Sequence, residues 1–472
     1  MKRWMLVFLG ATLAASATAP EPSPVPPQRS PVTVRVLLAK GSHFEVGLPQ
    51  GGDLIGDRKT RHFPASTELR VEADGAALRI DGKIVHHATL VPAGQPSASH
   101  LHFLAEGNHA LFTVAGVPYR GTLTLDEVEG QVHLLDEVDL EAYLYGVVPR
   151  ELNTDTMEAE KAQAVVSRTY VLGHLHPERE YDVASGVEAQ AYGGFRVETI
   201  KTRQAVDQTA GQVLSYRGVL ARQVCFHATC GGETAANEDV FDAAPVPYLR
   251  RVTEGGSKAM SDLDLPPADP YCECSPYYRW TVTWDQQQLE DSLRQALKVP
   301  VTAGSLIDLR PVALTAAGRV EKLEARFTGA TEVMSGDAIR RALTFRDTAG
   351  KRHNLYSTWF TISHEGAVFT ATGRGWGHGV GMCQWGAIGM ARQGHSYDEI
   401  LRHYFPGTDM TALSTLVARE TQRPCFLNEG PSSSTKSWRH RRFSRRRSRR
   451  STPSGRISKT GSGPSSSVSS SL

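Results

Sequence analysis

The sequence predicts an α+β protein with a mainly β N-terminal region, and three observations support this class. Residues 32 to about 125 hold short alternating or β-branched segments separated by turn residues. Beyond Asp139 the apolar residues recur at the spacing of helices. Further β-branched segments lie between those helices, at residues 313–327 and 359–371. Mixed helices and antiparallel strands are therefore expected in the larger part of the chain.

The N-terminal strands are expected to begin with residues 32–39. Residues 68–84 contain short alternating runs with breaks at Asp74-Gly75 and Asp81-Gly82. Asp-Gly pairs between such runs are typical of hairpin turns. We therefore expect consecutive hairpins in this part of the chain.

The strongest helix signal begins near Asp155, which can cap a helix together with Glu158 three residues on. Its apolar stripe continues to Leu175. Other helices are expected at residues 198–209, 284–297, 335–343 and 383–392.

Charge is distributed unevenly along the chain. Lys and Arg total 52 and Asp and Glu total 50, a net charge of +2. Eleven of the basic residues and none of the acidic ones lie in residues 430–472, which leaves −9 for residues 1–429. This Ser/Arg-rich tail is predicted to be disordered. Its cations would attract an anionic envelope polymer or lipid, whereas no nucleic acid is expected as a partner because the tail lacks a folded reading module.

The N-terminus is typical of a secretory signal peptide. Lys2 and Arg3 precede an apolar segment at residues 4–15, and small residues follow that permit cleavage after Ala17. Residues 18–31 are a proline-rich linker. The body is therefore expected in the periplasm or cell envelope, after secretion across the inner membrane. An uncleaved anchor is the alternative, and it places the body in the same compartment.

The cysteines are expected to meet oxidising conditions there. Cys225, His227 and Cys230 lie within six residues and, with Cys272 and Cys274, resemble a set of zinc ligands. Because the compartment favours oxidation, disulfides are preferred over a metal, with Cys272 and Cys274 reaching to Cys230 or Cys225 rather than to each other. No metal site is predicted, and His227 is left to contact substrate. The remaining cysteines are Cys383 and Cys425.

The most unusual segment is residues 373–381, where glycine occupies every second position. In an extended strand one face would be bare backbone and the other would carry Arg374, Trp376 and His378. Stacking and hydrogen-bonding groups on one face suit a sugar polymer or another flat polar ligand. The alternative is a glycine-rich strand that crosses a crowded core with Trp376 buried.

Glu151 follows Pro149 shortly before the helix expected near Asp155. Pro149 restricts the backbone, so Glu151 is expected in a defined loop at the mouth of that helix. The helix dipole favours the ionised carboxylate, whereas a general acid needs a raised pKa. Position alone therefore favours a helix-terminal charge over a catalytic acid.

Four ordered motifs, at residues 143–151, 158–170, 226–232 and 373–386, resemble the family of stage II sporulation protein D and the amidase enhancer. The resemblance extends over residues 119–408. It implies a catalytic domain at residues 126–410, in which residues 280–350 form an inserted subdomain.

The resemblance also implies an activity. It points to a secreted lytic transglycosylase, a carbon–oxygen lyase that cleaves peptidoglycan glycan strands, preferably those without stem peptides, to 1,6-anhydro products. Glu151 is implied to act first as the catalytic acid and then as the base, and no cofactor is implied. The residues implied to bind the glycan are Tyr192, His227, Arg374, Trp376, His378, Gln384 and Trp385.

Two departures from the family pattern and one alternative function accompany this resemblance. The Cys-x4-His-Cys zinc motif of some members is missing, because residues such as Ala184, Ala189 and Gln190 stand there, and Cys383 replaces an expected serine. The alternative is a non-catalytic wall-binding protein. Such a protein would stimulate an N-acetylmuramoyl-L-alanine amidase or act as a scaffold in wall remodelling.

Overall fold

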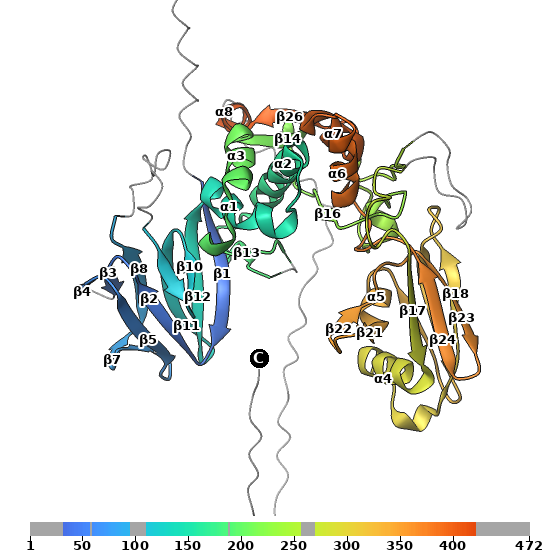
Figure 1. Ribbon diagram of the computed structural model, residues 1–472. Helices are drawn as coiled ribbons and strands as arrows, with labels where there is room; N and C mark the ends of the chain where they lie inside the picture. Colours follow the sequence, from blue (N-terminus) through green and yellow to red (C-terminus); the bar gives the residue numbers. More distant parts are fainter. Residues whose placement is uncertain (1–31, 57–58, 95–109, 187–188, 256–269, 422–472) are drawn as a thin grey trace, which may run out of the picture. The chain divides into compact units, whose positions relative to one another are not determined.

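The computed structural model describes residues 32–56, 59–94, 110–186, 189–255 and 270–421 of the 472-residue chain. Its helices and antiparallel sheets confirm the α+β class with a mainly β N-terminal region (Figure 1). The expected signal peptide, proline-rich linker and basic tail lie outside the described residues. None of the helices described combines the length and apolarity that a membrane crossing requires.

The N-terminal region forms two sheets that share one apolar core, to which Val46, Val71, Leu90 and Leu123 contribute. The first sheet contains, in spatial order, β13 (Val183–Ala184), β1 (Thr33–Gly41), β12 (Gln131–Asp139), β11 (Thr122–Val128), β8 (His87–Pro92), β3 (Gly52–Gly56) and β4 (Lys59–Phe63). The second contains β10 (Val117–Tyr119), β9 (Phe112–Val114), β2 (His43–Leu48), β5 (Thr67–Ala73), β6 (Leu78–Ile80) and β7 (Lys83–Val85).

The expected Asp-Gly turns connect three strands of the second sheet. Asp74-Gly75 lies between β5 and β6, and Asp81-Gly82 lies between β6 and β7. Asp81 and Gly82 both have positive φ, 49° and 75°, as the favoured two-residue hairpin requires.

Strand β12 leads directly into α1 (Leu140–Glu151). Asp139 ends β12 and is also the N-cap of α1, where its Oδ1 accepts hydrogen bonds from the N–H groups of Glu141 (2.9 Å) and Ala142 (3.3 Å). β1 pairs antiparallel with β12, starting with Thr33 opposite Asp139. The β-region therefore fixes the start of the helix that ends at Glu151.

A group of helices follows, and α1 packs there against α2 (Met157–His174) and α3 (Ile200–Gln208) (Figure 1). The fully buried guanidinium of Arg168 on α2 donates to the Glu141 carboxylate at 2.6 Å. Two further helices, α6 (Gln384–Arg392) and α7 (Tyr397–Tyr404), also pack against α2. The remaining elements here are β14 (Gln212–Tyr216), β15 (Val219–Leu220), β26 (Asp409–Ala412), α8 (Leu413–Thr421) and a 3-10 turn at Phe195–Val197.

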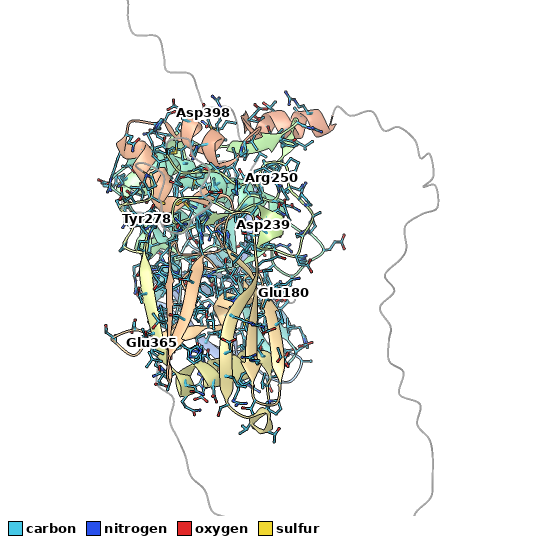
Figure 2. The ribbon with its side chains drawn as sticks, turned by 90° about the vertical axis from the view of Figure 1, so that its right-hand side faces the viewer. Glu180, Asp239, Arg250, Tyr278, Glu365 and Asp398 are labelled. Carbon is cyan, nitrogen blue, oxygen red and sulfur yellow. The ribbon has the colours of Figure 1, made fainter. Side chains whose placement is uncertain are left out.

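Residues 280–371 contain an apolar core of their own, which includes Trp280, Leu323 and Phe369. One sheet consists of β17 (Trp280–Asp285), β24 (Val368–Gly373) and β23 (Phe360–Glu365), and another of β18 (Leu306–Leu314), β19 (Val320–Phe327) and β20 (Thr331–Ser335). Tyr278 lies at one end of these strands, and Glu365, in the β23–β24 hairpin, lies toward the other (Figure 2). The other elements are α4 (Gln286–Leu297), α5 (Ala338–Ala342), β21 (Thr344–Arg346), β22 (Arg352–Asn354) and a 3-10 turn at Val301–Ala303.

Several helix starts differ from the expectation: α3 begins at Ile200 instead of residue 198, and α5 begins at Ala338 instead of residue 335, where β20 ends. The helix expected from residue 284 begins at Gln286, because Trp284 and Asp285 still pair with β24 and the Asp285 carboxylate caps α4. Asp155 does not cap α2. It forms an exposed ion pair with Arg392 at 2.9 Å, and Thr156 is the N-cap residue.

The Arg168–Glu141 pair yields a stability prediction. Replacing Glu141 with Gln leaves the Arg168 guanidinium buried without its counter-ion, so the free energy of unfolding should fall by about 3 kcal/mol. The matched control is Glu72→Gln, which breaks the exposed 2.6 Å pair with Arg70 and should cost less than about 1 kcal/mol. Urea unfolding of both variants measures the two losses. Similar losses would contradict a special role for the buried pair.

Candidate functional site

Glu151 is the last residue of α1, and the expectation that it lies in a loop is wrong. Pro149 stands inside the last turn and cannot donate to the Tyr145 carbonyl, yet the helix continues to Glu151 and the Leu152 N–H donates to the Val148 carbonyl at 2.8 Å. The carboxyl group therefore lies at the C-terminal end of a helix. There the helix dipole disfavours the ionised form, the opposite of the expected effect.

Two neighbouring segments hold Glu151. The backbone N–H of Ala191 donates to its Oε1 at 2.5 Å. The Gln384 side-chain amide donates to its backbone carbonyl at 2.9 Å and to the Gln163 Oε1 at 3.2 Å. The predicted site residues Glu151 and Gln384 are thus brought together by α1 and α6.

The electrostatic environment of Glu151 contains opposing influences. Burial is the largest effect and raises the pKa of the half-buried carboxyl. The Ala191 N–H, the Arg150 cation and Gln384 act in the other direction and limit how far the pKa rises. Burial outweighs these groups, and a carboxyl with a raised pKa is better suited to act as a general acid than an ordinary surface carboxyl.

Tyr192 lies beside this site, but its side chain points into the core. Its hydroxyl donates to Asp136 Oδ2 at 2.9 Å, and its ring lies 5.1 Å from the Tyr143 ring. Burial raises the pKa of both Tyr192 and Asp136. In this conformation Tyr192 supports the segment that carries Ala191, and its predicted contact with substrate stays a prediction.

The glycine-rich segment is not the extended strand that we expected. β24 ends at Gly373, and Gly375, Gly377, Gly379 and Gly381 all have positive φ, between 73° and 111°. A Cβ atom on Gly381 would lie 2.1 Å from the Cys225 carbonyl oxygen. Glycine is needed here because the backbone adopts positive φ and passes close to residues 225–231, which lie far earlier in the chain.

The three side chains expected on one face of this segment have different environments. Arg374 is only 2% exposed, with its guanidinium 3.7 Å from the centroid of the Trp359 ring. Trp376 is 36% exposed and lies beside Tyr277, with ring centroids 4.3 Å apart. His378 is half-buried, and burial lowers its pKa to about 4. Trp376 is therefore the exposed member of the three.

His227 and Trp385 lie along the same segment. His227 is buried, its Nδ1 lies 3.1 Å from the Val380 carbonyl oxygen, and its ring is 5.6 Å from that of His378. Burial holds the pKa of His227 well below its usual value, so the ring is neutral at pH 7. The half-buried Trp385 donates its backbone N–H to the Ala228 carbonyl at 3.0 Å. These contacts place His227 and Trp385 where the glycine-rich segment packs against residues 225–231.

The five cysteines within the described residues are unpaired, contrary to the expected disulfides, and Cys425 lies outside those residues. Cys225 and Cys274 do not join the buried thiols. Instead Cys230 lies beside Cys272, with a 3.6 Å distance between the sulfur atoms. Cys383 and Glu254 complete this group.

Several contributors to the site had not been identified from the sequence. Glu254 is an isolated carboxylate in the sequence, and the Ala191 N–H is a backbone group with no side-chain signal. Gln163 lies within the motif at residues 158–170, and its place in that motif is the sequence feature that points to it.

Comparisons with known proteins place these features in a family context. The family described as Stage II sporulation protein matches residues 128–216, which include Glu151, and a domain of unknown function matches residues 235–381. An uncharacterized protein of Brachyspira hyodysenteriae is 33% identical over 303 residues, covering 63% of this chain and 74% of that protein.

Two relatives carry functional names. The amidase enhancer of Bacillus subtilis is 28% identical over 308 residues, and the match covers 57% of this chain but only 40% of the enhancer. Stage II sporulation protein D of Bacillus amyloliquefaciens is 27% identical over 305 residues, covering 61% of this chain and 78% of that protein.

The glycine path can be tested with two alanine substitutions. Gly381→Ala and Gly394→Ala both place a side chain at positive φ, 73° and 92°, which costs about 1 kcal/mol. Only Gly381→Ala adds a clash, since nothing lies within 4 Å of a Cβ at Gly394. Urea unfolding should therefore show a clearly larger loss for Gly381→Ala. Equal losses would mean that residues 225–231 do not constrain the segment.

The raised pKa of Glu151 predicts a pH-dependent stability difference. A carboxyl whose pKa is raised on folding favours the folded state below its unfolded pKa, and this contribution is lost as pH rises through the folded pKa. Glu151→Gln removes that loss and keeps an oxygen for the Ala191 N–H. The free energy of unfolding of the variant, relative to wild type, should therefore increase as pH rises above 4.5. A difference that stays constant with pH would contradict the raised pKa.

Proposed function

Because the chain belongs to the family of stage II sporulation protein D and the amidase enhancer, we propose that it is a peptidoglycan lytic transglycosylase with Glu151 as its acid–base residue. The observation that carries this proposal is a half-buried carboxyl whose pKa is raised at the end of α1. The proposed setting is wall remodelling in the periplasm or cell envelope.

In the first step, protonated Glu151 donates its proton to the glycosidic oxygen between N-acetylmuramic acid and N-acetylglucosamine, and the bond from that oxygen to the muramoyl C1 breaks. Burial and the C-terminal end of α1 both favour the protonated carboxyl that this step requires. The leaving saccharide retains the proton as a new hydroxyl group.

In the second step, the Glu151 carboxylate takes the proton from the muramoyl C6 hydroxyl, and that oxygen bonds to C1. The product is a 1,6-anhydro sugar, no water is consumed, and Glu151 is protonated again. The Ala191 N–H supports the carboxylate between the two steps. One carboxyl group serves both steps, whereas most glycoside hydrolases use a pair. The charged residue among the described ones that shifts the pKa of Glu151 is Arg150, a cation, and no second carboxylate among the described residues does so.

Trp376 is the residue that we propose to stack against the glycan. It is 36% exposed, and Tyr277 lies against it. An exposed aromatic face suits the apolar face of a sugar ring. Gln384 is proposed to hold Glu151 rather than the sugar, because its amide is engaged with the Glu151 carbonyl and with Gln163.

A non-catalytic function is the second candidate, and the name of one relative favours it. That relative is called an amidase enhancer. On this alternative, the chain binds the wall and stimulates an N-acetylmuramoyl-L-alanine amidase, and the position of Glu151 is structural.

An assay with glycan strands that lack stem peptides distinguishes the two candidates. Purified wild-type protein should release fragments with 1,6-anhydro ends, detected by mass spectrometry. Glu151→Gln should reduce the rate by at least about 100-fold, the usual effect of removing a general acid–base group. Strand binding, measured by co-sedimentation, should stay unchanged.

The matched control is Glu158→Gln, which changes a half-buried carboxylate of α2 that pairs with Lys161 and accepts a hydrogen bond from the Tyr397 N–H, contacts a neutral amide can partly keep, and it should retain activity. Absence of anhydro fragments from wild type, together with stimulation of an added amidase, would support the enhancer function. Full activity of Glu151→Gln would refute the assignment of Glu151.

A further inference from the structure

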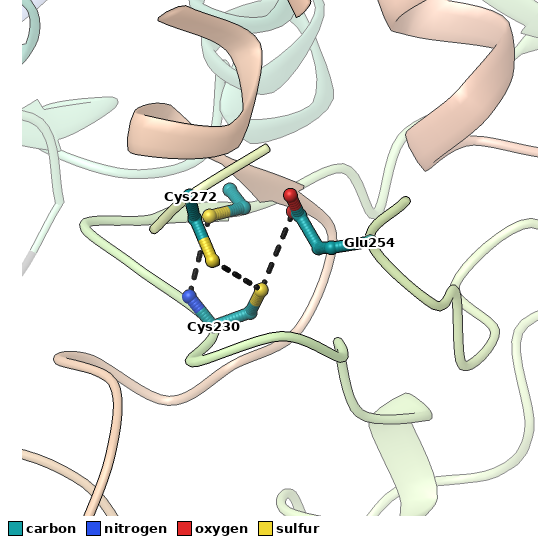
Figure 3. Close-up of side chains that lie close together, drawn as sticks. Cys230, Glu254 and Cys272 are labelled. Carbon is teal, nitrogen blue, oxygen red and sulfur yellow. Dashed lines mark hydrogen bonds between the residues drawn. The ribbon is translucent and has the colours of Figure 1, made fainter. Parts of the chain in front are cut away.

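Four buried side chains from separate segments converge at one point: Cys230, Glu254, Cys272 and Cys383. One sulfur or carboxylate oxygen from each lies within 4.8 Å of the other three. Cys230, Glu254 and Cys272 point toward one another (Figure 3). Cys230, Cys272, Cys383 and Glu254 are all fully buried.

The distances in this cluster fit a shared metal ion better than a covalent bond. The sulfur atoms of Cys230 and Cys272 are 3.6 Å apart, whereas a disulfide requires about 2.05 Å. Two sulfurs at about 2.3 Å from a tetrahedral zinc ion are about 3.8 Å apart. The 3.3 Å distance from the Cys230 sulfur to the Glu254 Oε1 is close to the spacing of a sulfur and an oxygen on such an ion.

The carboxylate supplies an independent observation. The Glu254 Oε2 is buried and has no hydrogen-bond partner among the described residues. Its Oε1 accepts a 2.6 Å hydrogen bond from the Tyr404 hydroxyl, which fixes the orientation of the group. A buried carboxylate oxygen without a donor requires compensation, and a bound cation provides it. Ligand carboxylates are commonly held by such an outer hydrogen bond.

Backbone N–H groups are directed at the sulfur atoms. The Gly232 N–H donates to the Cys230 sulfur at 3.4 Å, and the Cys230 N–H donates to the Cys383 sulfur at 3.2 Å. Cys383 is the N-cap of α6, and its sulfur also accepts from the Gly386 N–H at 3.3 Å. A thiol is a weak acceptor, so several donors on buried sulfurs suit thiolates, the form in which cysteine binds metals.

We propose that Cys230, Cys272, Cys383 and Glu254 bind one zinc ion. Three thiolates and one carboxylate give the four ligands of a tetrahedral site, and sulfur-rich tetrahedral sites select zinc. Because all four positions are filled by protein, the ion would be structural rather than catalytic. This replaces both the expected disulfides and the prediction of no metal site.

The proposed ion joins segments that carry the candidate site. Cys230 follows His227, and Cys383 precedes Gln384, whose amide contacts the Glu151 carbonyl. Removal of the ion should therefore loosen α6 and the position of Glu151. The zinc proposal itself does not depend on the proposed enzyme activity, since metal content and spectra are measured without any glycan.

The first experiment measures metal in the full chain after purification without a metal-affinity step. We expect one zinc ion per chain by inductively coupled plasma mass spectrometry. Exchange with cobalt(II) should give intense visible bands and a thiolate-to-metal absorption in the near ultraviolet. Chelation under conditions that strip the ion should lower the thermal midpoint, and added zinc should restore it.

Variants identify the ligands. Cys272→Ser should abolish stoichiometric zinc and the thiolate absorption. Its matched control is Cys274→Ser, two residues away, which removes an exposed thiol outside the cluster and should keep both signals. Glu254→Gln should weaken zinc retention, because a neutral amide replaces the carboxylate.

If Cys272→Ser fails to fold, wild type still decides the question. A thiol-specific mercurial, added after the chain is unfolded in guanidinium so that the buried thiols can react, should then release one zinc ion per chain. A chain without zinc that also fails to take up cobalt after reduction overturns the proposal. An intact mass two hydrogens lower, with a peptide that links Cys230 to Cys272, overturns it as well.

Discussion

The close passage of the glycine segment along residues 225–231 is the constraint on which the candidate site depends. A Cβ on Gly375 would lie 2.8 Å from the Cys230 carbonyl oxygen, and one on Gly377 would lie 2.8 Å from the His227 Cβ. At the end of this path, β25 (Met382–Cys383) pairs in parallel with β16 (Phe226–His227), and α6 begins at the next residue. The path thereby delivers Gln384 to the Glu151 carbonyl. A side chain at Gly375 or Gly377 would therefore force this path, and with it the start of α6, to shift.

A second contact ties residues 280–371 to this same path. The fully buried Arg319, which precedes β19, donates to the carbonyl oxygens of Cys230 and Glu233, both at 2.9 Å. A Cβ on Gly379 would lie 2.8 Å from its guanidinium. Burial lowers the pKa of Arg319 to about 10, so it stays charged at pH 7. Residues 280–371 therefore support the site through a buried cation and backbone carbonyls.

The sequence was sufficient for the local features and insufficient for those that depend on packing. Asp74-Gly75 and Asp81-Gly82 carry their own turn chemistry, and the stripe of α2 has helical spacing, so both could be predicted. α1 was missed because Leu140 to Val148 are buried on nearly every side, which removes the polar face that marks a helix. The regular glycine spacing suggested a strand, but alternate positive φ produces the same pattern. The partnership of Glu254 with three cysteines depends on long-range contacts that no spacing records.

The region that needs the proposed zinc ion most is the one with the least regular structure. Among the described residues between 221 and 279, the elements are β16 and a 3-10 turn at Asn237–Asp239. Because this stretch forms few helix or sheet hydrogen bonds, its conformation must be fixed by side-chain contacts or cross-links. A disulfide would join two of its points, whereas a tetrahedral ion joins Cys230, Glu254 and Cys272 to each other and to α6 through Cys383. Full burial keeps these three thiols from external oxidants, while Cys274 is exposed beside them. The burial that makes an unpaired carboxylate costly also protects the ligands that a metal requires.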